Sequence, residues 1–266
     1  MVPRVGVTGI VFPRAQSSIA RVLLVQRGQP PAQGLWAFPG GKLEHQATIV
    51  SDAQREVLEE TGIAAQVHAP AGRSRAARQP IVAVTEAIDD TFHYVLAHTV
   101  LTECTAGSQP SPGDDAAAAA WVPTIALLAA AGSATPSSAS DPYAQDQGLV
   151  VPVSGTVERM QAPTAAEFPG LQQFLQPPAD AALSIAAPGN VQAILNALEE
   201  RWGWQPKDRA WVAANLMQAG AQAGEHARSS QPAGSTEACT TTLHLVPSMA
   251  IPLLQAIDYV SDVARA

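Results

Sequence analysis

The sequence predicts an α/β protein in which a mixed sheet lies between helices, followed by a C-terminal helical region. Runs of valine, isoleucine and leucine bounded by turn residues recur between residues 5 and 103, and a glycine turn at 40–41 leads into a helical pattern. Beyond residue 188 the apolar residues recur at helical spacing. Strands that alternate with helices form a sheet with helices on its faces, which predicts the fold class of the first half.

The first two strands are expected at 5–12 and 21–27, paired as a hairpin. Residues 28–34, rich in proline and glycine, are expected as a loop. The helix after the glycine turn is expected to end at Gly62, because glycine adopts the left-handed C-cap conformation without a steric penalty. The other elements expected in this half are a strand at 64–68, a hairpin of strands at 81–88 and 93–103, a loop at 110–115 and a helix at about 125–131.

The second half of the chain differs in composition. Residues 132–155, rich in serine, alanine and proline, are expected as a linker, and 229–242 as a flexible segment. Helices are expected at 191–202, 208–223 and 250–264. We therefore divide the chain into a domain at 1–132, a linker and irregular segment at 133–187, and an α-helical region at 188–266.

Three tryptophans fall in the predicted helical region, namely Trp202, Trp204 and Trp211. Such a group either packs between helices or offers a stacking platform for a ligand, and we expect core packing. No catalytic motif accompanies them. Docking on the first domain, dimerisation and partner binding all stay open for this region.

The helix after the glycine turn gathers acidic side chains on one face. Glu56, Glu59 and Glu60 lie at i, i+3 and i+4, and Asp52 lies one turn earlier. We expect no basic residue on that face to balance them, so the carboxylates repel one another. A hard divalent cation of the Mg²⁺ type prefers carboxylate oxygens and explains the cluster. The alternative is an acidic helix face in water.

These residues resemble the Nudix box, Gly-x5-Glu-x7-Arg-Glu-U-x-Glu-Glu-x-Gly-U, in which U is an aliphatic residue. Eight positions match at the required spacing: Gly41, Arg55, Glu56, Val57, Glu59, Glu60, Gly62 and Ile63. The segments 22–28 and 35–41, and more loosely 93–95 and 113–123, are similar to the ADP-ribose pyrophosphatase branch of the Nudix hydrolases. The resemblance covers about residues 3–131. It implies the Nudix fold, an α/β/α sandwich with a mixed sheet, and a Mg²⁺ cofactor, with Mn²⁺ as an alternative.

One position departs from the box. The first glutamate of the pattern falls at Ala47. The resemblance implies that this glutamate is mainly a structural partner of the box arginine, so its absence leaves Arg55 short of a carboxylate. Glu44, on the same loop, is our hypothesis for a substitute.

The resemblance also implies roles for individual residues. The metal ligands would be Glu56, Glu60, Glu59 and the backbone carbonyl of Gly40. The catalytic group would contain Arg55 and a general base, for which Glu59 and Asp115 are the candidates; Asp114 and Asp115 are equally well explained as turn residues. The substrate-binding residues would be Arg27, Trp36 and Gly41, although a structural role is open for Arg27 and Trp36. A loop at 71–79 carries Arg73, Arg75 and Arg78 and is either solvated or a lip that reaches phosphate.

The charge and composition of the chain exclude some classes of binding partner. The net charge is −8, and lysine and arginine do not cluster, so we expect no nucleic acid or membrane partner. The two cysteines give no disulfide framework, which fits a reducing, cytoplasmic compartment. No apolar run has the length of a membrane span, and no signal peptide is visible. A homodimer is left open.

Three functions follow from these observations. The first is Mg²⁺-dependent hydrolysis of the pyrophosphate bond of a nucleoside diphosphate linked to another moiety, with ADP-ribose as the leading small-molecule substrate. The second is a nucleoside triphosphate pyrophosphatase that clears damaged nucleotides. The third is a catalytically weak nucleotide-binding module, which Ala47 keeps open.

Overall fold

The computed structural model describes residues 2–14, 19–30, 32–68, 80–88, 92–133, 150–154, 188–217, 240–244 and 249–264. The arginine-bearing loop predicted at 71–79 and most of the predicted linker lie outside these residues. No helix within the described ranges is long and apolar enough to cross a membrane.

Strand β1 (Arg4–Phe12) is central to a mixed sheet. It pairs in parallel with β7 (His93–Glu103) and antiparallel with β4 (Gly40–Lys42), so that Thr8 has His98 on one side and Gly40 on the other. Strands β5 (Ala65–Val67) and β6 (Ile81–Ile88) pair antiparallel with opposite ends of β7. The hairpin predicted for 81–88 and 93–103 is confirmed, because Ile88 pairs with His93.

A second sheet contains β3 (Trp36–Ala37), β2 (Arg21–Arg27) and β8 (Ala116–Pro123) in that order. The predicted hairpin between 5–12 and 21–27 is wrong, because β1 and β2 are both present but belong to different sheets. Strand β2 pairs instead with β8, with Leu24 opposite Ala120. The sequence pattern does not predict β8, since alanine has a low strand propensity and the pairing with β2 decides the conformation.

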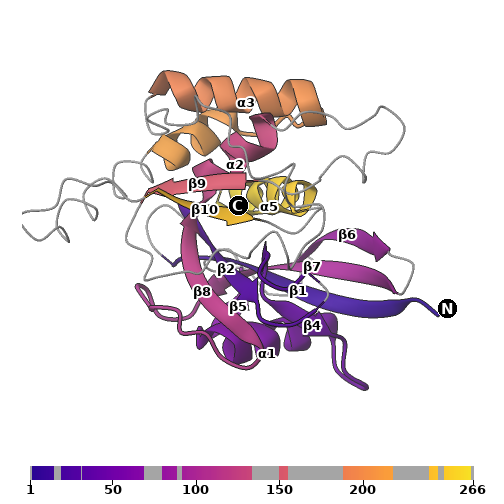
Figure 1. Cartoon of the computed structure of the whole chain (residues 1–266). Coiled ribbons are helices and arrows are strands. Elements are labelled where there is room, and N and C mark those ends of the chain that lie inside the picture. The colour runs from indigo at the N-terminus through magenta and orange to yellow at the C-terminus, as the bar shows by residue number, and fades with distance from the viewer. Residues whose placement is uncertain are drawn as a thin grey trace, which may run out of the picture.

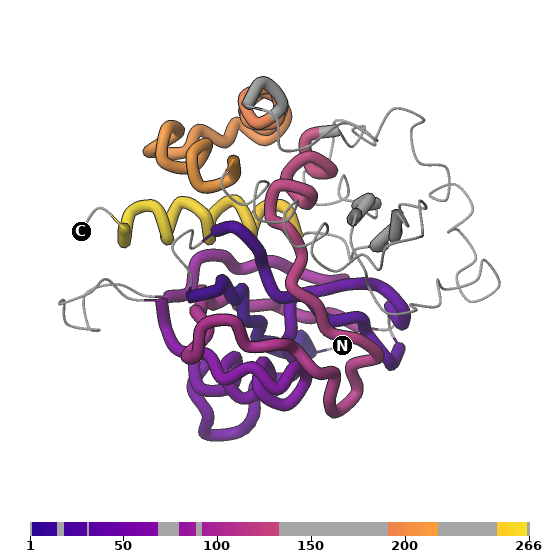
Figure 2. The backbone as a smooth tube through the Cα atoms, turned by 90° about the vertical axis from the view of Figure 1, so that its left-hand side faces the viewer, coloured from indigo at the N-terminus to yellow at the C-terminus, as the bar shows by residue number. Residues whose placement is uncertain are grey.

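Helices cover both faces of the sheets (Figure 1). Helix α1 (Ile49–Thr61) lies on one side, and Figure 2 shows the helices α2 (Thr124–Ser133) and α5 (Ala250–Ala264) on the other. On the α1 side, Ala53 and Val57 pack with Val7 and Leu101 of the sheet, and all four are 0% exposed. The predicted α/β/α sandwich with a mixed sheet is therefore confirmed.

The C-terminal helices share one apolar core with the sheet. Helix α3 (Pro188–Trp202), a helix over 209–217 and α5 supply fully buried residues such as Leu195 and Ile257 to a cluster that also contains Ile10 and Val100. The three tryptophans of this region, Trp202, Trp204 and Trp211, belong to this cluster or pack against it, as predicted. Tyr259 of α5 donates a hydrogen bond to the backbone carbonyl of His68 at 3.1 Å.

Two short strands interrupt segments predicted to be irregular. Strand β9 (Val150–Ser154) lies within the predicted linker and pairs antiparallel with β10 (Thr240–His244), which overlaps the predicted flexible segment. Those predictions are wrong for these residues. Both runs are rich in β-branched residues, but each is short and becomes a strand only by pairing with the other. At one end of the pair Val150 lies opposite His244, which is 94 positions later in the sequence. The boundaries proposed for the domains stay a prediction.

Candidate functional site

Helix α1 begins and ends at residues that fix its bounds. The hydroxyl of Thr48, the N-cap, accepts a hydrogen bond from the Ser51 N–H at 3.1 Å, and the Ser51 hydroxyl accepts one from the Thr48 N–H at 3.0 Å. This capping box satisfies donors that the first turn would leave unpaired. Gly62 ends the helix with a φ of 67°, the left-handed C-cap predicted from the sequence. The helix is thereby held with its acidic face beside the glycine turn.

Two glutamates of α1 are buried against the glycine turn. Glu60 accepts a hydrogen bond from the Gly40 N–H at 2.8 Å. Glu56 lies so close to Gly41 that a Cβ at that position would fall 2.4 Å from its Oε1 atom. Burial raises the pKa of Glu60 to about 8, and burial also raises the pKa of Glu56. A side chain at position 41 would therefore displace the Glu56 carboxylate from its place against the turn.

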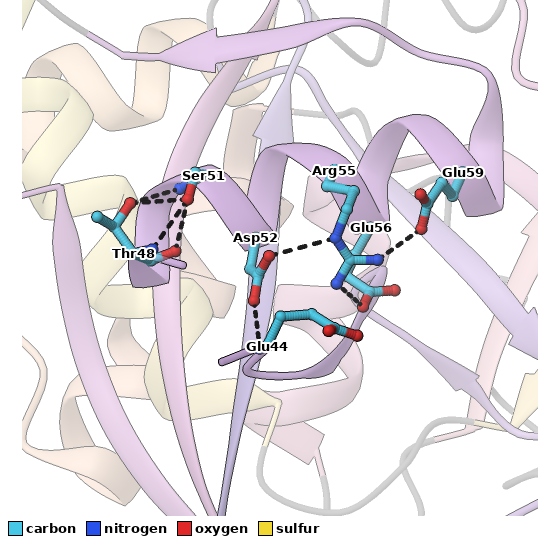
Figure 3. Close-up of polar contacts among 7 residues, drawn as sticks. All are labelled: Glu44, Thr48, Ser51, Asp52, Arg55, Glu56 and Glu59. Carbon is cyan, nitrogen blue, oxygen red and sulfur yellow. Dashed lines mark hydrogen bonds and ion pairs between the residues drawn. The ribbon is translucent and has the colours of Figure 1, made fainter. Parts of the chain in front are cut away.

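Arg55 lies across the acidic face. Its guanidinium donates to Asp52 at 3.2 Å through Nε, to Glu56 at 2.8 Å and to Glu59 at 2.6 Å (Figure 3). The prediction that no basic residue balances this face is therefore wrong. The physical reason is local, since Asp52 and Glu59 stand three residues before and four residues after the arginine on one helix.

The substitute suggested for the missing box glutamate is corrected in the same way. Among the described residues Arg55 forms its ion pairs with acids of its own helix, whereas Glu44 contributes its backbone N–H, which donates to Asp52 Oδ2 at 2.6 Å. Sequence reasoning assigned no such contact to Asp52. The i, i+3 spacing between Asp52 and Arg55 is the signal from which it could have been found.

The structure brings Arg27 and Asp115 near Glu60. Besides burial, which is the main cause, the charge of Asp115 raises the pKa of Glu60 and the charge of Arg27 lowers it. The loop before Asp115 packs on the end of α1, because the Gly113 N–H donates to the Glu60 carbonyl at 3.0 Å. The Asp115 carbonyl in turn accepts from the Gly28 N–H at 2.9 Å. Three segments distant in sequence thus converge at the buried glutamate.

Trp36 lies in the core, away from these groups. Its side chain is 1% exposed and belongs to the apolar cluster on the α2 and α5 side. A fully buried indole has no surface with which to flank a base. The structure therefore supports the structural role considered for Trp36 and does not place it at a substrate surface.

The donor atoms at the acidic face suit a hard cation, although they are not arranged as a ready site. Within the described part of the chain, no three His, Cys, Asp or Glu side chains form a group that could hold a metal ion as they stand. Arg55 engages Glu56 and Glu59, and Glu60 turns toward the Gly40 N–H. The charge of Glu56 also raises the pKa of Glu60, a repulsion that a divalent ion would relieve. Carboxylate oxygens are the ligands that Mg²⁺ prefers, so the residues fit the ion once Arg55 releases them.

Comparison with known proteins gives one family. A model of the NUDIX domain matches residues 2–140. No curated protein sequence matches the chain. The solved structures similar to it include a MutT NUDIX hydrolase from Burkholderia pseudomallei, which is 25% identical with a TM-score of 0.36 over 46% of this chain and 84% of that one.

Two further solved structures are similar to the chain. A bifunctional NMN adenylyltransferase/ADP ribose pyrophosphatase from Francisella tularensis, complexed with AMP and a Mn ion, is 26% identical with a TM-score of 0.34; the match covers 45% of this chain and 34% of that one. The NUDIX domain of Shewanella oneidensis NrtR, complexed with ADP ribose, is 17% identical with a TM-score of 0.37; the match covers 48% of this chain and 77% of that one. The chain thus spans about a third of the Francisella protein.

Proposed function

The chain belongs to the NUDIX domain family; we propose that it is a pyrophosphohydrolase of that family and uses Mg²⁺ to hydrolyse a nucleoside diphosphate linked to another moiety. ADP-ribose is the first substrate we propose, on the strength of the sequence resemblance at 22–28 and 35–41. The observation that carries the proposal is the pair of buried glutamates, Glu56 and Glu60, facing the glycine turn. Burying two carboxylates side by side is costly, and a divalent ion would add positive charge to that of Arg55 beside Glu56 and of Arg27 near Glu60.

The roles of the residues follow from their positions. A bound divalent ion would neutralise the diphosphate oxygens and lower the pKa of the attacking water. Glu56 and Glu60 would hold the ion together with Glu59 and the Gly40 carbonyl. Glu59 and Asp115 are the candidates for accepting the proton of the water. The water oxygen forms a bond to one phosphorus as the bridging P–O bond breaks, which gives AMP and ribose 5-phosphate from ADP-ribose.

Two cationic groups and one glycine complete the proposed site. Arg27 would contact a phosphate, because its charge already acts at Glu60. Gly41 would let the diphosphate approach the turn, since this position has no side chain. Arg55 would release Glu56 and Glu59 to the ion and keep its third partner, Asp52.

A turnover assay tests this proposal. The full chain is given ADP-ribose, NADH, sugar nucleotides, diadenosine polyphosphates and dNTPs, with Mg²⁺ and with chelator. We expect Mg²⁺-dependent release of AMP from ADP-ribose, lost by at least about a hundredfold in Glu60→Gln because a ligand and its charge are removed. Glu200→Gln, on the exposed surface of α3, is the matched control and keeps wild-type turnover. Turnover of ADP-ribose that survives chelation, or that Glu60→Gln leaves unchanged, contradicts the proposal.

Two features favour a second candidate. Ala47 removes the box glutamate, and Arg55 occupies two of the proposed ligands. Both features suit a nucleotide-binding module with weak catalysis. Tight binding of ADP-ribose in calorimetry, without turnover at any Mg²⁺ or Mn²⁺ concentration, would favour this module over the enzyme.

A further inference from the structure

Asp52 hydrogen-bonds to two parts of the site, the backbone that follows the glycine turn and the guanidinium of Arg55. It lies in the first turn of α1 and is 3% exposed. One carboxylate oxygen, Oδ2, accepts the backbone N–H of Glu44 at 2.6 Å, and the other, Oδ1, accepts Nε–H of Arg55 at 3.2 Å (Figure 3). The carboxylate therefore ties the segment that follows the glycine turn to the guanidinium on the helix.

Asp52 also differs from the other two partners of Arg55. Glu56 and Glu59 face the glycine turn or the solvent and are proposed metal ligands. A cation that takes their oxygens removes those two partners from the guanidinium. Asp52 is the partner that the guanidinium would keep, because both of its oxygens are already engaged by N–H groups.

We propose that Asp52 is a positioning residue: from the first turn of α1 it holds the Arg55 guanidinium, so that Glu56 and Glu59 can pass from the guanidinium to a divalent ion. The proposal rests on the proposed function. Without Asp52, the guanidinium would keep, among the residues that the structure describes, only Glu56 and Glu59 as anionic partners, and it would compete with the ion for them. Mutation of a residue that holds the metal ligands in place without touching the metal typically weakens metal affinity by about 10- to 100-fold.

The first measurement is the affinity of the full chain for Mn²⁺ alone, by calorimetry, without substrate. We expect Asp52→Ala to weaken Mn²⁺ binding by about tenfold. Asp52→Asn keeps an oxygen for Arg55 but presents an NH₂ group in place of one acceptor, so its loss is smaller. Thr48→Ala is the matched control: it removes the cap of the same helical turn, lowers the urea midpoint of unfolding, and leaves the Mn²⁺ affinity within about twofold.

A double-mutant comparison shows whether Asp52 acts through Arg55. If it does, Arg55→Ala and the double variant Asp52→Ala/Arg55→Ala bind Mn²⁺ equally well, because the competitor is absent from both. If the double variant binds Mn²⁺ several-fold more weakly than Arg55→Ala, Asp52 acts on the ion directly and the proposal is overturned. Equal Mn²⁺ affinities for Asp52→Ala and Thr48→Ala overturn it as well.

A second readout needs neither metal nor substrate. Exchange of the Arg55 Nε–H with solvent, followed by NMR in the presence of chelator, reports the contact to Asp52. We expect this exchange to be slow in the wild type and in Thr48→Ala, and fast in Asp52→Ala. If the wild type binds no Mn²⁺, the metal part of the proposed function fails, while the Nε–H exchange still decides whether Asp52 positions Arg55; equally slow exchange in Asp52→Ala refutes that role.

Discussion

Lowering the pH from 7.5 to 4 should unfold this protein partly through one residue, His98. The imidazole is 4% exposed on β7 and lies between two hydroxyls, with Nδ1 at 2.7 Å from Thr8 Oγ1 and Nε2 at 2.8 Å from Thr85 Oγ1. Burial lowers the pKa of His98 from 6.5 to about 4. The ring is thus neutral in the folded protein at pH values where it is protonated in the unfolded chain.

The sign and size of the effect follow from these two pKa values. The folded pKa is lower than the unfolded pKa, so the unfolded chain binds more protons between pH 6.5 and 4, and stability falls as the pH falls through this window. The free energy of unfolding should drop by about 2 kcal/mol between pH 7.5 and pH 5, and by about 3 kcal/mol at pH 4. Below pH 4 both states are protonated and the loss from this residue levels off.

The assay is urea unfolding of the wild type and of His98→Leu in chelator at pH 7.5, 6, 5 and 4. The leucine variant leaves the Thr8 and Thr85 hydroxyls without this partner, which costs stability at every pH but does not titrate. The difference between the two proteins isolates His98, because other groups, including buried His68, titrate in both. Parallel pH profiles for the two proteins would show that His98 is not held neutral by the fold.

Three further predictions concern stability and the site. Gly62→Ala should lower the free energy of unfolding by about 1 kcal/mol in urea titration, because φ is 67° and the nearest atoms to a Cβ, of Ser111, are 3.9 and 4.0 Å away, so backbone strain is the main cost; an unchanged midpoint contradicts this. Gly41→Ala should displace Glu56, since the Cβ would fall 2.4 Å from Oε1, and calorimetry should show Mn²⁺ binding weakened by about tenfold. Ile257→Ala in α5 should lower the free energy of unfolding by about 3 kcal/mol, because the side chain is 0% exposed in the core that α5 shares with the sheet. If the C-terminal helices of this variant unfold before the sheet does, as followed by tryptophan fluorescence of the sheet, the core is not shared.

Much of the fold is predictable from the sequence because the spacing of apolar residues indicates where helices and strands lie. Helix α1 has an apolar stripe at helical spacing and a glycine at its end, and both its position and its C-cap agree with the structure. The strands at β1 and β2 are equally clear, but their pairing is not, because a local pattern does not state which sheet a strand joins. Strand β8 begins with five alanines and becomes a strand only by pairing with β2.

The sequence was enough to predict which acidic side chains form the candidate site, but not which residues they pair with. The i, i+4 spacing of Glu56 and Glu60 predicts that both lie on one face of α1. In the structure this face lies against the glycine turn, where Glu56 is close to Gly41 and Glu60 accepts the Gly40 N–H. The orientation of Arg55 depends on its rotamer, for which an arginine has many choices, so its three ion pairs are visible only in the structure. Trp36 illustrates the opposite case, since its position in the sequence suggests a ligand contact and its burial assigns it to the core.

The contact between Tyr259 and His68 joins positions 191 residues apart. Helix α5, which carries Tyr259, packs on β6 and β7, so the ribosome completes those strands long before their cover is made. Bringing such distant segments together costs loop-closure entropy and slows folding. During synthesis the apolar side of the sheet that α5 covers is therefore exposed to water, and we expect the nascent chain to need chaperone protection until α5 has been made.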